Sequence, residues 1–302
     1  MTMTAFPKIF DSSMMALYKN CPQLFRLTYI EQWKPKELSV HLHAGAAFAK
    51  AIEATRTAYY VGGDEADNSI AIGLAALIEA YGDFECPADS AKSLERMLGA
   101  FEFYWSRYPL GTEVDPIVLP GGKRGIEFSF AEPLPIMHPE TNEPLIYCGR
   151  MDAILNYAGG QFICDEKTTS SLGASWSRQW DLRAQFTGYA WACQKAGIRV
   201  DGAIVRGVSI LKTKYDTQEA ISYRPEWQVQ RWYDELLDWI EDIIRDWKRS
   251  KFRHNLDHAC GDYGGCAFRG VCSSTKEFAD ATLETYFERR YWDPILRIEE
   301  KL

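Results

Sequence analysis

The sequence lacks the long apolar runs and the leading charged-then-apolar pattern that mark membrane spans and secretory signals. No apolar stretch approaches the roughly 20 residues that a membrane-spanning helix needs. The first residues, MTMTAFPKIFDSS, carry no signal pattern, and the chain has no evident internal repeat or low-complexity tract. These absences favour a folded cytoplasmic protein that does not act in a membrane.

The sequence also lacks an overall excess of positive charge. Its formal net charge is -8, and its isoelectric point is about 5.3. Contact with nucleic acid would therefore have to rely on local basic patches rather than on the surface as a whole. The candidates are residues 247–254 (WKRSKFRH) and Lys123-Arg124, although such a stretch is more often a solvated helix end or turn than a binding site.

The 302 residues, 46% apolar and 25% charged, suffice for one large domain or a core with an appendage. Helical periodicity covers residues 12–27, with Ser12 or Ser13 near the N-cap, and then 44–60, 69–81, 91–108, 180–196 and 225–251. Alternation over 125–130 and β-branched residues over 202–211 predict strands. The pattern predicts an α/β protein with a core over 110–215, a helical region over 1–109, and a long helix with a cysteine-rich segment over 216–302.

The long helix over 225–251 carries a stripe of large apolar side chains at helical spacing. We expect this stripe to pack into the core rather than to stack on nucleic-acid bases. Its members are Trp232, Leu236, Trp239, Ile243 and Trp247.

Two acids and a lysine stand close to a predicted hairpin turn at Gly159-Gly160. A two-residue loop there, or a four-residue loop over 158–161, places Asp152 opposite Lys167 and puts both on one face with Asp165. A three-residue loop would send Asp152 to the other face. Two neighbouring carboxylates suit Mg²⁺ or Mn²⁺, and the ammonium can orient water or stabilise charge on a phosphate. Solvated charges on a surface hairpin are the alternative.

Three of the eight cysteines, Cys260, Cys266 and Cys272, lie at regular five-residue gaps in a Gly-rich segment. Closely spaced cysteines in an intracellular chain usually indicate a metal, and a tetrahedral site needs a fourth ligand. Free thiols without a metal are the alternative. The cysteines in apolar or mixed segments fit buried free thiols: Cys86, Cys148, Cys164 and Cys193.

The hairpin resembles the core of the PD-(D/E)XK nuclease superfamily, RecB-like branch. The resemblance rests on Gly149-x-x-Asp152 and, across the turn, Asp165-x-Lys167. It implies a restriction-endonuclease-like core with a mixed central sheet flanked by helices, Asp152 and Asp165 as metal ligands, and Lys167 as the catalytic lysine. Gln185-Phe-Thr-Gly-Tyr189 matches the Gln-x-x-x-Tyr motif that family members use near DNA and the active site.

A second element, Tyr18-Lys-Asn-Cys21-Pro22-Gln-Leu-Phe25, resembles one found in iron–sulfur members such as CRISPR adaptation nucleases and the AddB nuclease domain. The resemblance implies that Cys21 and the three late cysteines hold a [4Fe-4S] cluster that ties the ends of the chain together. The five-residue gap between Cys260 and Cys266 departs from many members, which have two residues there, so Zn²⁺ remains an alternative.

A second departure concerns catalysis. The branch has Gly-x-x-x-His-x-x-x-Glu on an early helix, and here Gly45 and Glu53 fit that frame with Ala49 at the histidine position. Glu53 is a candidate metal ligand, and His43 is not expected to replace the missing histidine. Glu127 is a further candidate carboxylate, although an exposed strand glutamate is the simpler interpretation.

The resemblance implies a metal-dependent deoxyribonuclease, an exonuclease that acts on DNA ends or single strands. Family members work beside recombination, helicase or CRISPR partners, and phages carry stand-alone versions. The substitution at Ala49 and the acidic surface leave open a non-catalytic DNA- or partner-binding protein on the same fold. An iron–sulfur redox protein is less well supported, because nothing in the sequence suggests an electron partner.

Overall fold

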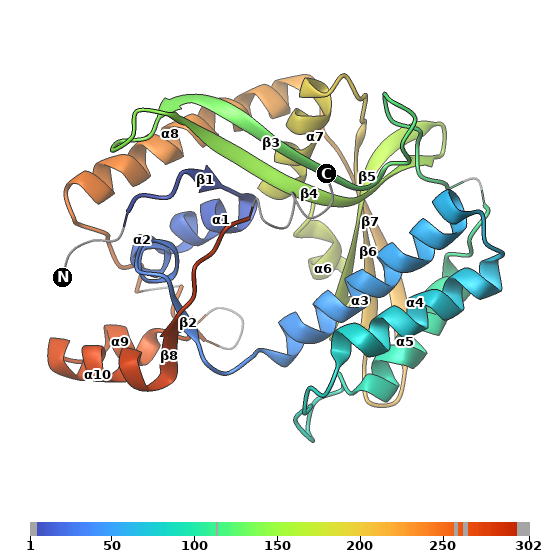
Figure 1. The fold of residues 1–302 in the computed structure, drawn as a ribbon, viewed down its shortest axis with the longest axis horizontal. Helices are drawn as coiled ribbons and strands as arrows, with labels where there is room; N and C mark the ends of the chain where they lie inside the picture. Colours follow the sequence, from blue (N-terminus) through green and yellow to red (C-terminus); the bar gives the residue numbers. More distant parts are fainter. Residues whose placement is uncertain (1–4, 113, 257–258, 262–264, 295–302) are drawn as a thin grey trace. The chain divides into compact units, whose positions relative to one another are not determined.

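The computed structural model describes residues 5–112, 114–256, 259–261 and 265–294 (Figure 1). The chain forms two compact units, each assembled from segments distant in sequence. Unit 1 comprises Met1–Leu38, Ser129–Gly149 and Arg231–Leu302, and unit 2 comprises Ser39–Phe128 and Arg150–Gln230. Among the helices in the described ranges, none is long and apolar enough to span a membrane.

Unit 2 is built on a mixed sheet. Strand β5 (Gly160–Thr169) pairs antiparallel with β4 (Pro144–Tyr157) and parallel with β6 (Gly202–Ile210), and β6 pairs antiparallel with β7 (Tyr215–Tyr223). Strand β3 (Ile126–Met137) also pairs with β4. The predicted strand over 202–211 is confirmed, whereas β7 had no counterpart among the expected elements.

Helices cover both faces of this sheet (Figure 1). Val208 and Ile210 of β6 belong to one apolar cluster with α3 (Val40–Thr57), α4 (Ala66–Tyr81) and α5 (Leu94–Arg107). Gly207 points to the other face, where an added Cβ would lie 2.4 Å from the Trp176 ring of α6 (Ala174–Arg178). Helix α7 (Ala184–Lys195) contacts β5 and β6 and begins later than the expected residue 180. A short π-helical turn, η2 (Ala58–Gly62), follows α3.

The β4–β5 hairpin turns one residue earlier than the sequence predicts. Tyr157 pairs with Gly160, and the two loop residues are Ala158 and Gly159, with φ of 48° and 81°. Positive φ at both positions suits a two-residue loop whose twist matches the strands. Gly160 is instead required for close packing, since an added Cβ would lie 2.8 Å from Phe162 Cε2. The expected register, which sets Asp152 opposite Lys167 and so Ile154 opposite Asp165, is therefore wrong, because Ile154 pairs with Ile163.

Unit 1 begins with β1 (Ile9–Phe10), which pairs in parallel with Ile146 and Tyr147 of β4. Its first helix is α1 (Ser12–Asn20), capped by Asp11, whose carboxylate accepts the Met14 N–H at 2.8 Å. The expected Ser12 or Ser13 cap is wrong. The expected helix over 12–27 is divided, because Pro22 cannot continue α1 and instead opens α2 (Pro22–Phe25), followed by the π-helical η1 (Arg26–Ile30).

The remaining elements of unit 1 are α8 (Glu226–Lys248, most of which lies in this unit), α9 (Arg269–Cys272), α10 (Lys276–Tyr286), and the antiparallel pair β2 (Trp33–Pro35) and β8 (Phe287–Arg289). The predicted apolar stripe of α8 packs into the core: Trp232, Leu236 and Ile243 are buried. The Tyr18 hydroxyl donates to the buried Asp246 carboxylate of α8 at 2.8 Å, which joins α1 to α8. The stripe therefore serves packing, as expected.

The α3–α4 contact generates a stability prediction. An added Cβ at Gly73 of α4 would lie 2.0 Å from Thr55 Oγ1 and 2.9 Å from the Ala51 carbonyl oxygen of α3. We expect Gly73→Ala to lower the free energy of unfolding by about 1–3 kcal/mol because the helices must separate. Gly45→Ala is the matched control. Its Cβ would meet only Thr168 Oγ1 at 3.7 Å, so helix propensity should make it neutral or stabilising by up to about 1 kcal/mol. Urea denaturation measures both, and equal effects would contradict the packing argument.

Candidate functional site: an acidic cluster on β5 and four thiols

Asp165 and Lys167 stand on the same face of β5. Their alternation along the strand brings Lys167 Nζ to 2.6 Å from Asp165 Oδ2. Asp165 is 3% exposed, whereas the Lys167 side chain is 38% exposed. The pair therefore presents a buried carboxylate and an ammonium that remains accessible from solvent.

Asp152 joins this pair through the backbone of β5. The β4–β5 ladder ends at Ala153 and Cys164, and beyond it Asp152 Oδ2 accepts the N–H of Glu166 at 3.2 Å. The Asp152 carboxylate thus lies against the strand segment between Asp165 and Lys167. The expected position of Asp152 directly opposite Lys167 is wrong, because the observed register, if continued, would set it opposite Asp165.

The buried Asp165 and the half-buried Asp152 concentrate negative charge at one point of the sheet. Burial and then the charges of Asp165 and Glu166 together raise the pKa of Asp152 to about 7, although Lys167 acts in the opposite direction. Burial also raises the pKa of Asp165, while Lys167 acts in the opposite direction. A divalent cation would relieve this repulsion, so the donor set fits Mg²⁺ or Mn²⁺.

The structure places Glu127 in a less exposed position than the strand pattern predicts. Its side chain is only 11% exposed and forms an ion pair with Arg150 Nε at 2.8 Å. Burial, followed by the charge of Asp152, raises its pKa to about 7. Strand alternation predicted an exposed residue, but Glu127 has a φ of 52°, outside regular strand geometry. No local sequence signal indicates this backbone conformation.

Glu53, the other candidate ligand, lies on α3 and pairs with Lys50 Nζ at 3.2 Å. The charge of Lys50 also lowers the pKa of Glu127. Lys50 is therefore within electrostatic reach of both Glu53 and Glu127. His43 does not take the place of the missing histidine: its Nε2 lies 2.8 Å from the Tyr81 carbonyl oxygen, and its ring stacks on Phe84 at 4.2 Å.

Gln185 and Tyr189 occupy one face of α7, one turn apart. Gln185 Nε2 donates to the Tyr189 hydroxyl at 3.0 Å, as the i,i+4 spacing predicts. Tyr189 is buried and Gln185 is half-buried. Just before this helix, the charge of Arg183 lowers the pKa of Asp165, which places the start of α7 within electrostatic reach of the acidic cluster.

The residue between Asp165 and Lys167 anchors β5 from the opposite face. Glu166 forms a buried ion pair with Arg56 of α3, including a hydrogen bond from Arg56 Nη1 at 3.1 Å. Glu166 also accepts a hydrogen bond from the Tyr104 hydroxyl of α5 at 2.9 Å. Burial alone would raise the pKa of Glu166, but Arg56 outweighs it and holds the pKa at about 2.

The four cysteines of the predicted cluster line one small cavity of about 10 Å³ in unit 1, with Leu24, Leu27 and Phe268 among its walls. Burial and then the other three thiols together raise the pKa of the Cys272 thiol to about 11. The sequence prediction that Cys21 meets the three late cysteines is therefore consistent with their positions. Residues 262–264 of the Gly-rich segment lie outside the described residues.

Neither group is arranged as a closed metal site. Within the part of the chain that the structure describes, no three His, Cys, Asp or Glu side chains are placed to hold a metal ion together. At the acids, the Lys167 ammonium lies against Asp165. At the cysteines, the donor set still suits four-thiolate coordination.

A family model described as the PD-(D/E)XK nuclease superfamily matches residues 12–273 of the chain. This match covers both cysteine groups and the whole acidic cluster. The chain belongs to the PD-(D/E)XK nuclease superfamily. The expected fold class, a mixed central sheet flanked by helices, is confirmed. A search of curated proteins finds no match.

Two solved structures resemble this PD-(D/E)XK chain at low identity. One, a candidate exonuclease from Eubacterium rectale, is 14% identical with a TM-score of 0.49, over 82% of this chain and 85% of the other. The second, SSO0001, is 14% identical with a TM-score of 0.27, over 77% and 84% of the two chains.

The Arg56–Glu166 pair predicts how the stability of this PD-(D/E)XK protein depends on pH. The folded-state pKa of Glu166 lies below its ordinary value of 4.5, so the pair stabilises the fold above pH 4.5 and loses its effect as the pH falls toward 2. We expect Glu166→Gln to lower the free energy of unfolding by about 3–5 kcal/mol at pH 7, because it leaves Arg56 buried without its counter-charge.

Urea denaturation at pH 7 and pH 3.5 measures this difference, which should shrink at the lower pH. Glu219→Gln is the matched control. It removes a carboxylate from a more exposed ion pair, in which the Glu219 side chain is 25% exposed, so the loss should be smaller. A difference between Glu166→Gln and the parent protein that does not change with pH would contradict the assignment.

Proposed function

We propose that this PD-(D/E)XK protein is a Mg²⁺- or Mn²⁺-dependent DNA nuclease of the RecB-like branch that acts as an exonuclease on ends or single strands. The observation that carries the proposal is the arrangement of Asp152, Asp165 and Lys167 at one point of β5. A buried carboxylate and a half-buried one beside a partly exposed lysine suit metal-assisted hydrolysis of a phosphodiester.

Each residue has a separate role. Asp152 and Asp165 would hold the cation, with Glu127 as an additional carboxylate near Asp152. Glu53, which pairs with Lys50, is a further candidate ligand. When bound, the cation would lower the pKa of a water molecule and offset charge on the phosphate. Lys167 would orient the attacking water or stabilise the developing negative charge.

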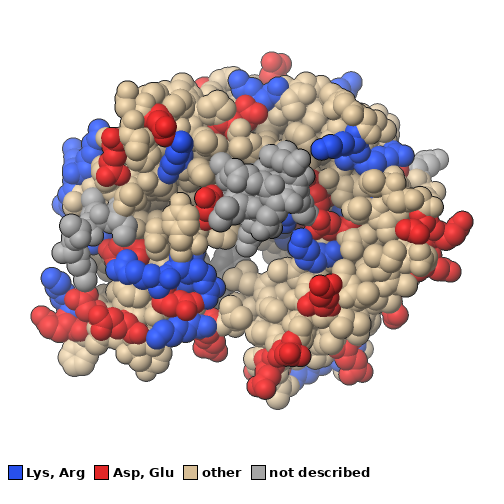
Figure 2. Space-filling view, in the orientation of Figure 1, with Lys and Arg blue, Asp and Glu red and all other residues tan. Residues whose placement is uncertain are grey.

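DNA would be positioned by the start of α7. Gln185 and Tyr189 form a polar pair on one face of this helix, and Arg183 supplies a positive charge near Asp165. Figure 2 shows that Lys and Arg side chains occur in separate groups among acidic ones on the face in view. Binding by local patches therefore fits the acidic composition of the chain better than a general attraction to polyanions.

The thiols would have a structural role. Cys21, Cys260, Cys266 and Cys272 would hold a [4Fe-4S] cluster, or alternatively Zn²⁺, and so connect the N-terminal helices of unit 1 to its C-terminal segment. The shared cavity of the four thiols supports this proposal. Reduced cysteines and a DNA substrate both favour a cytoplasmic location.

Substitution of the acidic cluster tests the nuclease proposal. Asp165→Asn and Lys167→Met should each lower the cleavage rate of end-labelled DNA at least about 100-fold, because each removes a group from the reacting centre. Glu127→Gln should mainly raise the Mg²⁺ concentration needed for half-maximal cleavage, because it removes a carboxylate near the cation. EDTA should abolish cleavage by the parent protein, and added Mg²⁺ or Mn²⁺ should restore it.

Asp216→Asn is the matched control, since it changes an exposed acid on β7 and should leave the rate unchanged. Full activity in both Asp165→Asn and Lys167→Met would refute the assigned roles. A second candidate function, DNA binding without catalysis, is motivated by Ala49 in place of the usual histidine. DNA affinity without cleavage under Mg²⁺, Mn²⁺ and Co²⁺ would establish it.

Metal analysis tests the thiol proposal. Protein purified without oxygen should contain about four iron and four sulfide per chain for the cluster, or about one zinc for the alternative. Cys21→Ser and Cys272→Ser should both lose the metal, whereas Cys86→Ser, which changes a cysteine outside the cavity, should retain it. Protein free of iron, sulfide and zinc would contradict both versions.

A further inference from the structure

Unit 2 contains a pocket on the sheet face opposite the acidic cluster. Its volume is about 320 Å³, at the lower end of the range of roughly 300–1,000 Å³ usual for small-molecule sites. Arg206 of β6 lines it and pairs in register with Glu166, whereas Lys167 pairs with Gly207. Because neighbouring residues along a strand point to opposite faces, the pocket is separated from Asp165 and Lys167 by the sheet itself.

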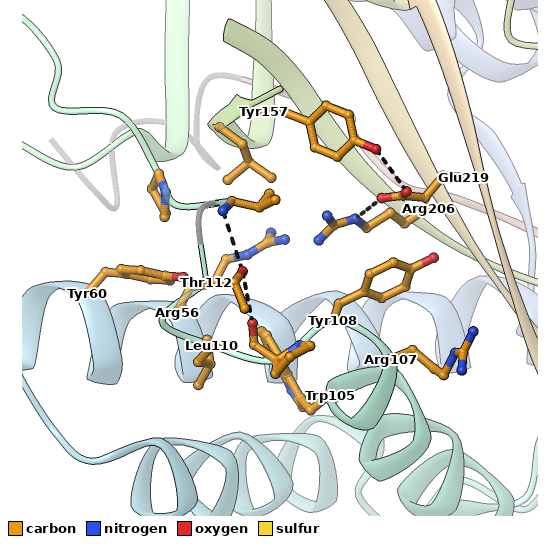
Figure 3. A pocket seen from close by; sticks show the side chains of 14 residues that line it. Arg56, Tyr60, Trp105, Arg107, Tyr108, Leu110, Thr112, Tyr157, Arg206 and Glu219 are labelled. Atoms are coloured by element: carbon orange, nitrogen blue, oxygen red, sulfur yellow. Dashed lines mark hydrogen bonds and ion pairs between the residues drawn. The ribbon is translucent and has the colours of Figure 1, made fainter. Parts of the chain in front are cut away.

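Two buried arginines form the floor of this pocket, which the exposed Arg107 and the carboxylate of Glu219 also line. Figure 3 shows the guanidinium groups of Arg56 and Arg206 turned toward each other from α3 and β6. Arg56 is 3% exposed and Arg206 is 5% exposed. Arg56 is held by Glu166, and Arg206 donates from Nε to Glu219 at 2.9 Å, so the far end of Arg206 remains directed into the pocket.

Glu166 and Glu219, each paired with one of the two guanidinium groups, reduce the repulsion between them, and an anion placed between the groups would interact favourably with both. Guanidinium groups also match the oxygens of a phosphate geometrically, because their N–H donors form a planar fork. The floor of the pocket therefore has the chemistry of a phosphate site.

Aromatic rings make up much of the remaining wall. Tyr60, Trp105, Tyr108 and Tyr157 all line the pocket, and the Arg206 guanidinium lies over the Tyr108 ring at 4.2 Å. Aromatic faces of this kind accept nucleobases by stacking, each base contributing about 1–3 kcal/mol. Charged and aromatic groups are thus combined in a volume that suits one nucleotide rather than a strand.

We propose that this pocket binds a nucleoside monophosphate, with the phosphate toward Arg56 and Arg206 and the base against the tyrosines. The site is distinct from the acidic cluster, lies on the other face of β5, and needs no divalent cation. The Arg56–Glu166 pair connects the pocket to the strand that carries the acidic cluster.

Isothermal titration of the full chain with dAMP in EDTA tests the proposal without reference to nuclease activity. The parent protein and Asp165→Asn should bind one dAMP with equal affinity, since the second site is independent of the acidic cluster. Thr112→Trp, at the exposed rim of the pocket, should weaken binding at least tenfold by filling it. Ser106→Trp, on the exposed surface of α5 outside the pocket, is the matched control and should bind normally.

Arg206→Lys adds a second measurement, since it keeps the charge but removes the planar fork, and should weaken dAMP binding about tenfold. Deoxyadenosine and inorganic phosphate, as separate probes, should each bind more weakly than dAMP. Absence of dAMP binding, or loss in Asp165→Asn with retention in Thr112→Trp, would overturn the proposal. Phosphate binding as tight as dAMP would also overturn it, because the aromatic wall would then contribute nothing.

Discussion

The buried ion pair between Arg56 and Glu166 is the constraint on which the candidate site depends. A carboxylate and a guanidinium removed from water are stable only together, so the pair fixes β5 against α3. Since Glu166 lies between Asp165 and Lys167, fixing its side chain on one face of the sheet also fixes its two neighbours on the other. The same residue offers its backbone N–H to Asp152, so the position of that carboxylate depends on β5 as well.

This arrangement gives the two faces of β5 different chemistry. On one face, carboxylates accumulate without enough positive charge, and the pKa of Asp152 rises to about 7. On the other, Arg56 holds the pKa of Glu166 at about 2, and a second arginine lies close by. Because neighbouring residues of a strand point to opposite faces, the acidic cluster and the Arg56–Glu166 pair lie within one residue of each other along β5.

The sequence predicted the hairpin and its three charged residues correctly, but the predicted pairing of β4 with β5 differs from the observed register by two positions. The physical reason is local. Two adjacent glycines suggested a loop at 159–160, but only Gly159 is needed for positive φ, and Ala158 supplies the other loop position. Gly160 is reserved for close packing against Phe162. Asp152 still reached the cluster because a shift of two residues preserves the face to which each side chain points.

The sequence by itself determined the α/β class, the family, the stripe of α8 that enters the core and the pairing of Gln185 with Tyr189, because each follows from spacing along one element or from ordered motifs. Only the tertiary structure decided that Glu127 is half-buried within electrostatic reach of Asp152, that Arg56 reaches Glu166 from a helix 110 residues earlier, and that Arg56 and Arg206 face each other. Such contacts join elements distant in the chain, and no periodicity encodes which side chains meet across them.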